Sequence, residues 1–401
     1  MKSWRRSAEE SVKNTTFERM CLFTPSQAFA LLVICGVAVS AQLPAPTVQL
    51  TAVRPIEPPA HPLPPEAASA SVSRFSFIAY GDTRGQADGI ELQSAHTTVV
   101  DAMLEKIASL AETPFPVRFI LQSGDAVSRG GDGRAWNVSF TPIIERLTRG
   151  AGVPFFFAVG NHDVTGMPPG DPGRMLGLHN TLSAISKLVP PEGSARRLSG
   201  YPTYAFGFGR VFAIAIDSNI AADAVQLGWV TDQLEHLDRS RYTHVIAFFH
   251  HPVFSAGPHG GLTIEPNTLA IRNFYTPLFR RHHVAMTITG HDHLFDHWIE
   301  RYDEAGTTYR RDDVVTGGGG APIYTYREEP DLEGYVADGA AQRVRIEHLA
   351  RPGATVADNP HHFVVVQVDG DRLWLEVVAA GGVNIAPYNG RSRIALSDKI
   401  S

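Results

Sequence analysis

Short apolar runs alternate with amphipathic stretches along most of the chain after residue 73. The apolar runs have the length and composition of β-strands, and the stretches between them place apolar residues at helical spacing. This alternation predicts an α/β fold. Two further pairs of apolar runs are separated by short turns and predict hairpins, so the sheets should be mixed. The predicted strands are residues 75–80, 117–121, 153–159, 245–249 and 284–288, the predicted helices are 95–110, 141–149, 222–237 and 267–281, and the hairpins are 204–208 with 211–216 and 362–368 with 373–378.

The first 41 residues have the pattern of a secretory signal peptide. Five basic residues precede an apolar run over 28–39, and the small residues Ser40 and Ala41 follow it. The run is shorter than the ~20 apolar residues needed to cross a bilayer. We therefore predict cleavage after Ala41 and a secreted or periplasmic protein, with an uncleaved signal anchor as the alternative.

The chain after the signal peptide divides by composition into three parts. Residues 42–73 are rich in proline, alanine and serine, which predicts a semi-extended linker. A folded domain is expected over 74–380 and a C-terminal tail over 381–401. Within the domain, residues 165–201 are rich in glycine, proline and basic residues and are predicted to form an insertion that shapes access to the site.

Composition and charge exclude several classes of protein. A hydrophobic content of 43% suits a globular chain with a large core. Both cysteines, Cys21 and Cys35, lie in the predicted signal peptide, so the mature chain would have neither a disulfide nor a thiolate metal ligand. Cleavage would leave 30 basic and 38 acidic residues, a net charge of −8, which argues against a nucleic-acid polymer as partner.

Each of the five predicted strands is followed by a small polar cluster. The clusters are Gly81-Asp82-Thr83-Arg84, Gly124-Asp125, Gly160-Asn161-His162-Asp163, His250-His251-Pro252 and Gly290-His291-Asp292-His293. In α/β sheets, ligands bind beyond the carboxyl ends of strands. Glycine opens four of the five clusters and lets the backbone turn sharply off the strand. The polar side chains are therefore expected to converge.

These clusters contain the donors of a transition-metal site. The candidate ligands are carboxylate, amide and imidazole groups, namely Asp82, Asp125, Asn161, His250, His291 and His293. Such oxygen and nitrogen donors suit Mn, Fe, Zn, Co or Ni, and the donor types do not choose among these metals.

The five clusters together resemble those of the calcineurin-like metallophosphoesterase superfamily, which includes the purple acid phosphatases and many bacterial phosphodiesterases. The resemblance covers about residues 75–324. It implies a four-layer α/β sandwich of two mixed sheets flanked by helices. It also implies a centre of two metal ions at the carboxyl ends of the strands.

The resemblance further implies a role for each residue. Asp125 would bridge both metals; Asp82 and His293 would hold one, and Asn161, His250 and His291 the other. His162 would donate a proton or stabilise the transition state, with Asp163 orienting it. Two such metals, about 3.5 to 4 Å apart, activate a water molecule for attack on phosphorus.

Two positions depart from the family patterns, and a third agrees with the purple acid phosphatases. Arg84 stands where most members have a histidine ligand, and arginine does not ligate metals at ordinary pH. Purple acid phosphatases compensate with a tyrosine, where this chain has Ser128. The metal of Asp82 and His293 would then lack one protein ligand, with water or Ser128 in its place. Arg84 either binds phosphate oxygens through its planar donors or pairs with a loop carboxylate. His259 lies where purple acid phosphatases have a substrate-contacting histidine, and simple solvation is its alternative.

The sequence therefore predicts a hydrolase of phosphomonoesters or phosphodiesters, acting on a small-molecule or lipid substrate. No serine-hydrolase elbow, phosphate-binding Walker loop or dinucleotide fingerprint is present. A metal-binding envelope protein of the same fold that has lost catalysis is the alternative. The oligomeric state stays open, and contact with a membrane is expected only through an uncleaved signal anchor.

Overall fold

The computed structural model describes residues 51–85, 90–165, 170–261, 264–396 and 399–400. Its helices are α1 (Ser94–Leu110), α2 (Thr141–Glu145), α3 (Asn161–Val164), α4 (Pro172–Ile185), α5 (Ala224–Glu235), α6 (Pro266–Ala270), α7 (Thr276–Arg281) and α8 (Glu333–Asp338). Its strands are β1 (Arg74–Tyr80), β2 (Val117–Gln122), β3 (Phe155–Phe157), β4 (Tyr204–Phe208), β5 (Val211–Ala215), β6 (His244–Phe248), β7 (Met286–Thr289), β8 (Phe295–Glu304), β9 (Thr307–Thr316), β10 (Arg345–Ala350), β11 (His362–Asp369), β12 (Arg372–Ala379), β13 (Arg393–Leu396) and β14 (Lys399–Ile400).

The strands form two mixed sheets, as the sequence predicts. The first sheet has the order β13-β12-β11-β1-β2-β3, and the second has the order β10-β8-β9-β7-β6-β5-β4, with β14 paired to β9. The neighbours β1, β2 and β3 run parallel in the first sheet, as do β5, β6 and β7 in the second. Parallel neighbours bring their carboxyl ends to one edge. Each sheet therefore presents such an edge to a common site.

An aromatic core joins the two sheets. Phe75 of β1 meets Phe208 of β4 edge-on at 4.9 Å between ring centroids, and Phe156 of β3 stacks on Phe206 of β4 at 3.7 Å. Each buried phenylalanine side chain stabilises the fold by about 1.5–3 kcal/mol. The sheets thus pack face to face, which holds their two edges in register.

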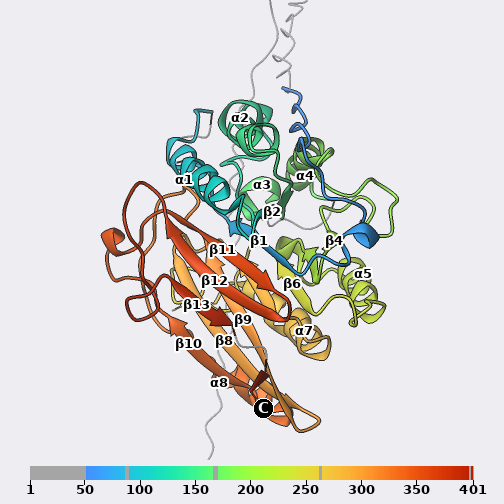
Figure 1. Cartoon of the computed structure of the whole chain (residues 1–401), viewed down its shortest axis with the longest axis vertical. Coiled ribbons are helices and arrows are strands. Elements are labelled where there is room, and N and C mark those ends of the chain that lie inside the picture. Colours follow the sequence, from blue (N-terminus) through green and yellow to red (C-terminus); the bar gives the residue numbers. More distant parts are fainter. Residues whose placement is uncertain (1–50, 86–89, 166–169, 262–263, 397–398, 401) are drawn as a thin grey trace, which may run out of the picture. The chain divides into compact units, whose positions relative to one another are not determined.

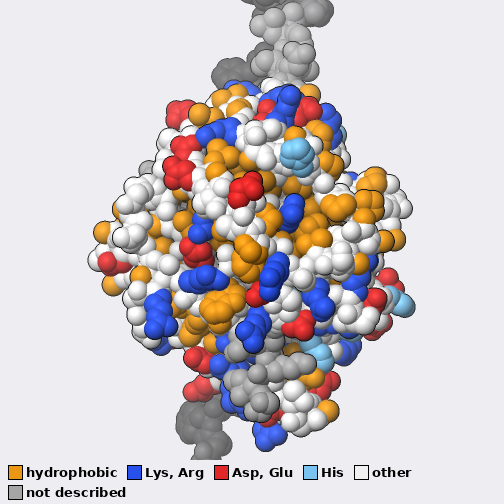
Figure 2. Space-filling model, viewed as in Figure 1, with side chains coloured by type: hydrophobic (Ala, Val, Ile, Leu, Met, Phe, Trp, Pro, Cys, Tyr) orange, Lys and Arg blue, Asp and Glu red, His pale blue; other side chains and the backbone are white. Residues whose placement is uncertain are grey.

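Helices cover the outer faces of both sheets. The core cluster between the sheets continues to buried residues of α1 and α2, and a second cluster lies between the other sheet and α5 and α7. Figure 1 shows α1 and α2 apart from α5 and α7, with strands between them. The arrangement is the four-layer sandwich that the sequence predicts. On the face viewed in Figure 2, basic and acidic side chains are interspersed.

The prediction of a separate linker is wrong for residues 51–73. Ile56 is fully buried in the larger core cluster, and its N–H donates to the Ala184 carbonyl of α4 at 2.9 Å. Glu66, in the short 3₁₀ helix Glu66–Ser69, accepts from Arg196 at 3.0 Å and from Tyr242 at 2.8 Å. Apolar contacts and these charge-assisted hydrogen bonds offset the entropy that keeps a proline-rich segment free. Residues 42–50 and the predicted signal peptide lie outside the described residues.

The C-terminal segment also belongs to the fold rather than forming a separate tail. β13 pairs with β12, and β14 pairs with β9. The buried ring of Tyr388 packs against Phe295, and its hydroxyl lies 2.8 Å from His297 Nδ1. The predicted insertion over 165–201 contains α4, which contacts α3. Among the described residues, no helix is long and apolar enough to cross a membrane.

Candidate metal centre

The structure brings all six candidate metal ligands together at the facing edges of the two sheets. Asp82, Asp125 and Asn161 follow β1, β2 and β3 of the first sheet, while His250 and the pair His291 and His293 follow β6 and β7 of the second. Ligand atoms of Asp82, Asp125 and His250 all lie within 4.8 Å of one another. The predicted convergence is therefore present.

Asp125 lies between two groups of side chains. Its Oδ1 is 3.4 Å from His250 Nε2, and its Oδ2 is 3.3 Å from Arg84 Nε. The side chain is 1% exposed. Its two oxygens therefore have different neighbours. We call Asn161, His250 and His291 the histidine half of the centre, and Asp82 and His293 the aspartate half.

In the histidine half, three ligand atoms that carry no proton lie close together. His250 Nδ1 lies 3.2 Å from the Ser123 carbonyl, an acceptor, so Nδ1 carries the proton and Nε2 has the lone pair. That Nε2 is 2.9 Å from Asn161 Oδ1 and 3.1 Å from His291 Nδ1. Such a gathering of acceptors is unfavourable unless a cation lies among them. The residues thus fit a bound metal ion.

The aspartate half shows the same need for a cation. His293 Nδ1 donates to the Pro322 carbonyl at 2.7 Å, and its Nε2 lies 3.5 Å from Asp82 Oδ1. Among the described residues, this buried Oδ1 has no hydrogen-bond donor. A buried acceptor without a partner costs about 1–3 kcal/mol. A metal ion between Asp82 and His293 would remove that cost.

Burial sets the protonation of these ligands. Burial lowers the pKa of His250 to about 3 and the pKa of His293 to about 3. Both imidazoles are therefore neutral at pH 7, the form that binds metals. Burial, followed by repulsion from Asp125, raises the pKa of Asp82 well above its usual value. Two adjacent buried carboxylates are held as anions only when a cation compensates them.

The backbone at the centre turns in a different way from the one predicted. Gly124 has φ 113°, but the other sharp turns lie at the ligands themselves, since Asp82, Asp125 and His291 have φ of 59°, 56° and 70°. Such conformations are costly for residues with a Cβ and cluster at functional sites. Gly290 instead provides space, because a Cβ there would lie 2.1 Å from Asp82 Oδ2.

His162 lies at the centre, but Asp163 does not orient its ring. His162 Nδ1 donates to the Ser128 carbonyl at 3.0 Å, and its Nε2 lies 3.9 Å from Asp125 Oδ2. Asp163 is buried and accepts from the N–H groups of Gly160 and Asp125, both at 2.8 Å. A carboxylate with several N–H donors braces the backbone. The role predicted for Asp163 is therefore corrected to holding the Asp125 loop.

The structure places Arg84 and His259 beside the centre. The Arg84 side chain is 18% exposed and points to Asp125, so its contact is with a central carboxylate and not with a surface loop. The His259 ring packs on His291 with centroids 4.3 Å apart. Their contact with a substrate stays a prediction.

Three residues of the site were not predicted from the sequence. Glu265 contacts both His291 and His259, Tyr324 stacks on His293 with centroids 4.1 Å apart, and buried Asp292 accepts from the His259 N–H at 3.1 Å. Glu265 and Tyr324 come from loops that follow no apolar run. Their position depends on tertiary packing alone.

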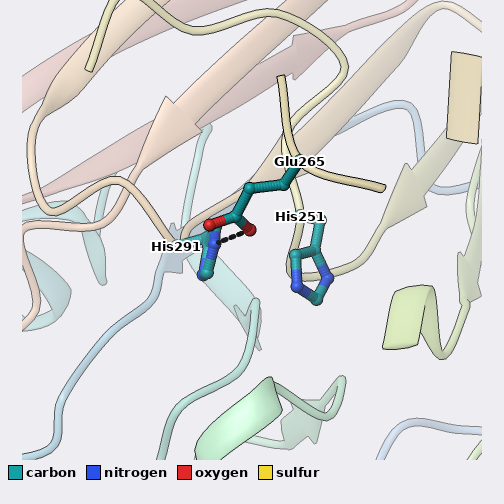
Figure 3. A group of neighbouring side chains, drawn as sticks. All are labelled: His251, Glu265 and His291. Carbon is teal, nitrogen blue, oxygen red and sulfur yellow. Dashed lines mark hydrogen bonds and ion pairs between the residues drawn. The ribbon is translucent and has the colours of Figure 1, made fainter. Parts of the chain in front are cut away.

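Glu265, His251 and His291 form a second cluster of metal-binding side chains (Figure 3). His251 Nδ1 lies 2.8 Å from Ser218 Oγ, and its Nε2 lies 3.2 Å from Asn267 Nδ2. Both nitrogens of His251 therefore have hydrogen-bond partners. Hydrogen bonds therefore account for this second cluster without a metal ion. They do not account for the acceptor atoms that lie together around Asp125.

Comparisons with known proteins identify the family of the chain and show its fold in a solved structure. A family model described as calcineurin-like phosphoesterase matches residues 76–295. Curated protein sequences give no match. Among solved structures, a purple acid phosphatase from yellow lupin (Lupinus luteus) seeds superposes with a TM-score of 0.55 at 16% identity, over 82% of this chain and 54% of that chain. This chain thus spans about half the length of the lupin protein. A dimetal phosphatase from Danio rerio has a TM-score of 0.45 at 14% identity, over 81% of this chain and 99% of that chain.

Proposed function

Because the chain belongs to the calcineurin-like phosphoesterase family, we propose that it hydrolyses phosphate esters at a centre of two metal ions. The observation that carries the proposal is the meeting of His250 Nε2, Asn161 Oδ1 and His291 Nδ1, acceptor atoms with no proton between them. A cluster held by hydrogen bonds alone would pair each of these acceptors with a donor, so their meeting supports a bound metal ion.

The candidate ligands form two groups, one for each metal ion. Asn161, His250 and His291 would hold one ion, Asp82 and His293 would hold the other, and Asp125 would be shared between the two groups. When bound, two ions of Mn, Fe, Zn, Co or Ni would polarise the phosphoryl group and supply an activated water. The backbone carbonyls of Ser123 and Pro322 keep the ligand nitrogens of His250 and His293 free of protons.

Three further side chains would act on the substrate. His162 is 34% exposed, and its Nδ1 donates to the Ser128 carbonyl, so the protonated form of the ring has an Nε2–H for the leaving oxygen. Such proton donation typically contributes 10²–10⁴-fold to the rate. When a phosphoester enters, the Arg84 guanidinium would turn part of its planar donor set from Asp125 to the phosphate oxygens. His259 would contact the same group from the opposite loop.

The proposed substrate is a small-molecule or lipid phosphoester. We also propose that the protein is exported, secreted or periplasmic, because of the predicted signal peptide. N-terminal sequencing of the protein recovered outside the cytoplasm tests this proposal, and an intact Met1 would contradict cleavage.

An assay of the purified protein against a panel of phosphomonoesters and phosphodiesters tests the proposed reaction. Metal content is measured on the same sample. We expect turnover that disappears on chelation and returns with added metal. Full metal loading without turnover of any ester would contradict the proposal and support the metal-binding envelope protein.

A further inference from the structure

Glu265 contacts the outer side of the centre with both carboxylate oxygens. Oε2 lies 2.8 Å from His291 Nε2, the pair joined by the dashed line in Figure 3, and Oε1 lies 2.7 Å from His259 Nδ1. The side chain is 33% exposed and directly precedes α6. One carboxylate therefore links His291, a candidate metal ligand, to His259, the histidine predicted to contact the substrate.

The contact with Glu265 determines which nitrogen of His291 is available to a metal. A carboxylate accepts a hydrogen bond, so His291 Nε2 carries the proton and Nδ1 has the lone pair. That Nδ1 is the atom 3.1 Å from His250 Nε2. His250 and His293 have their protons fixed by backbone carbonyls. Glu265 does the same for His291 with a side chain that can be substituted.

The same carboxylate fixes the ring of His259. His259 Nδ1 donates to Glu265, so Nε2 is the nitrogen left for a substrate. The backbone of His259 is also held, because its N–H donates to Asp292 at 3.1 Å. The ring packs on His291. Because Glu265 holds one nitrogen of each ring, its loss would free the side chains of both His259 and His291 to change position.

We propose that Glu265 is a positioning residue that makes metal binding and phosphate binding depend on one side chain. The proposal rests on the proposed function, but it predicts two equilibrium properties that need no turnover. Removing an outer partner of a metal-bound histidine typically costs 10–100-fold in metal affinity. Loss of the His259 anchor should weaken the binding of inorganic phosphate in the same variant.

The experiment compares Glu265→Ala with Glu304→Ala in the full chain. Glu304 makes a similar contact with His283 at 2.7 Å, at the far end of β8 from His293, and serves as the matched control. Co²⁺ affinity and the visible spectrum of bound Co²⁺ report on the metal ligands. Calorimetry with inorganic phosphate on the metal-loaded protein reports on His259.

We expect Glu265→Ala to lower Co²⁺ affinity about 10–100-fold, to change the Co²⁺ spectrum and to weaken phosphate binding, while Glu304→Ala leaves all three unchanged. If only one binding property falls, or neither does, the proposal is wrong. If Glu265→Ala does not fold, the same measurements are made on Glu265→Gln. Its single acceptor oxygen can serve one histidine, so at least one property should fall, and wild-type values for both would overturn the proposal. A wild-type protein without ester turnover would refute the proposed function and leave these measurements valid.

Discussion

The two halves of the centre share Asp125 but differ in what surrounds it. On the Oδ1 side, His250 lies against Asn161 and His291, and each of the three side chains has an atom with a free lone pair for a cation. On the Oδ2 side, the Arg84 guanidinium already lies 3.3 Å from the carboxylate. A fixed positive charge repels a metal ion and competes with it for the same oxygen. The histidine half should therefore bind metal more tightly than the aspartate half.

Removing the shared residue should have the largest effect, because it affects both halves at once. Asp125→Asn takes away the anion that compensates two cations, and we expect turnover to fall by several orders of magnitude and metal content to fall in both halves. Metal analysis and assay of the same preparation measure the two losses. Normal activity in this variant would show that the centre is misassigned.

Removing one ligand from each half should show which half binds its metal ion more tightly. After dialysis without added metal, we expect His293→Ala to keep about one metal ion per chain, while His250→Ala falls below that level, because it loses the tighter site. Metal-to-protein ratios from elemental analysis check the order. Equal loss in the two variants would contradict unequal halves.

Replacing Arg84 should have a smaller and more selective effect. A charge-assisted hydrogen bond to phosphate contributes about 1.5–3 kcal/mol, so Arg84→Ala should raise KM about 10- to 100-fold. Metal affinity of the aspartate half should rise in the same variant, because the competing charge is gone. Steady-state kinetics and metal titration measure both. An unchanged KM would exclude contact between Arg84 and the phosphate.

The convergence of the candidate metal ligands could be predicted because each follows an apolar run that forms a strand. Once parallel strands pair, their polar ends meet, so local sequence is sufficient for convergence. Glu265 and Tyr324 lack such a signal, since loop packing brings them to His291 and His293. The group that orients His162 is a backbone carbonyl, which accepts the hydrogen bond from Nδ1 and which any residue type supplies.

Two parts of the fold could not be predicted from hydrophobic pattern. The hairpin of β8 and β9 buries ion pairs in place of apolar side chains, such as the contacts of Arg311 with Glu300 and with Asp313. Its sequence therefore lacks the alternation of a half-buried strand. Residues 51–73 have the composition of a free linker, and their packing depends on a few contacts, including buried Ile56.

Calorimetric titration of the metal-free protein with Zn²⁺ tests the unequal, shared centre most directly. We expect two binding steps, a tight one for Asn161, His250 and His291 and a weaker one for Asp82 and His293. In Asp125→Asn both steps should weaken together. Two equal sites, or an Asp125→Asn variant in which only one step changes, would contradict a centre whose unequal halves share one carboxylate.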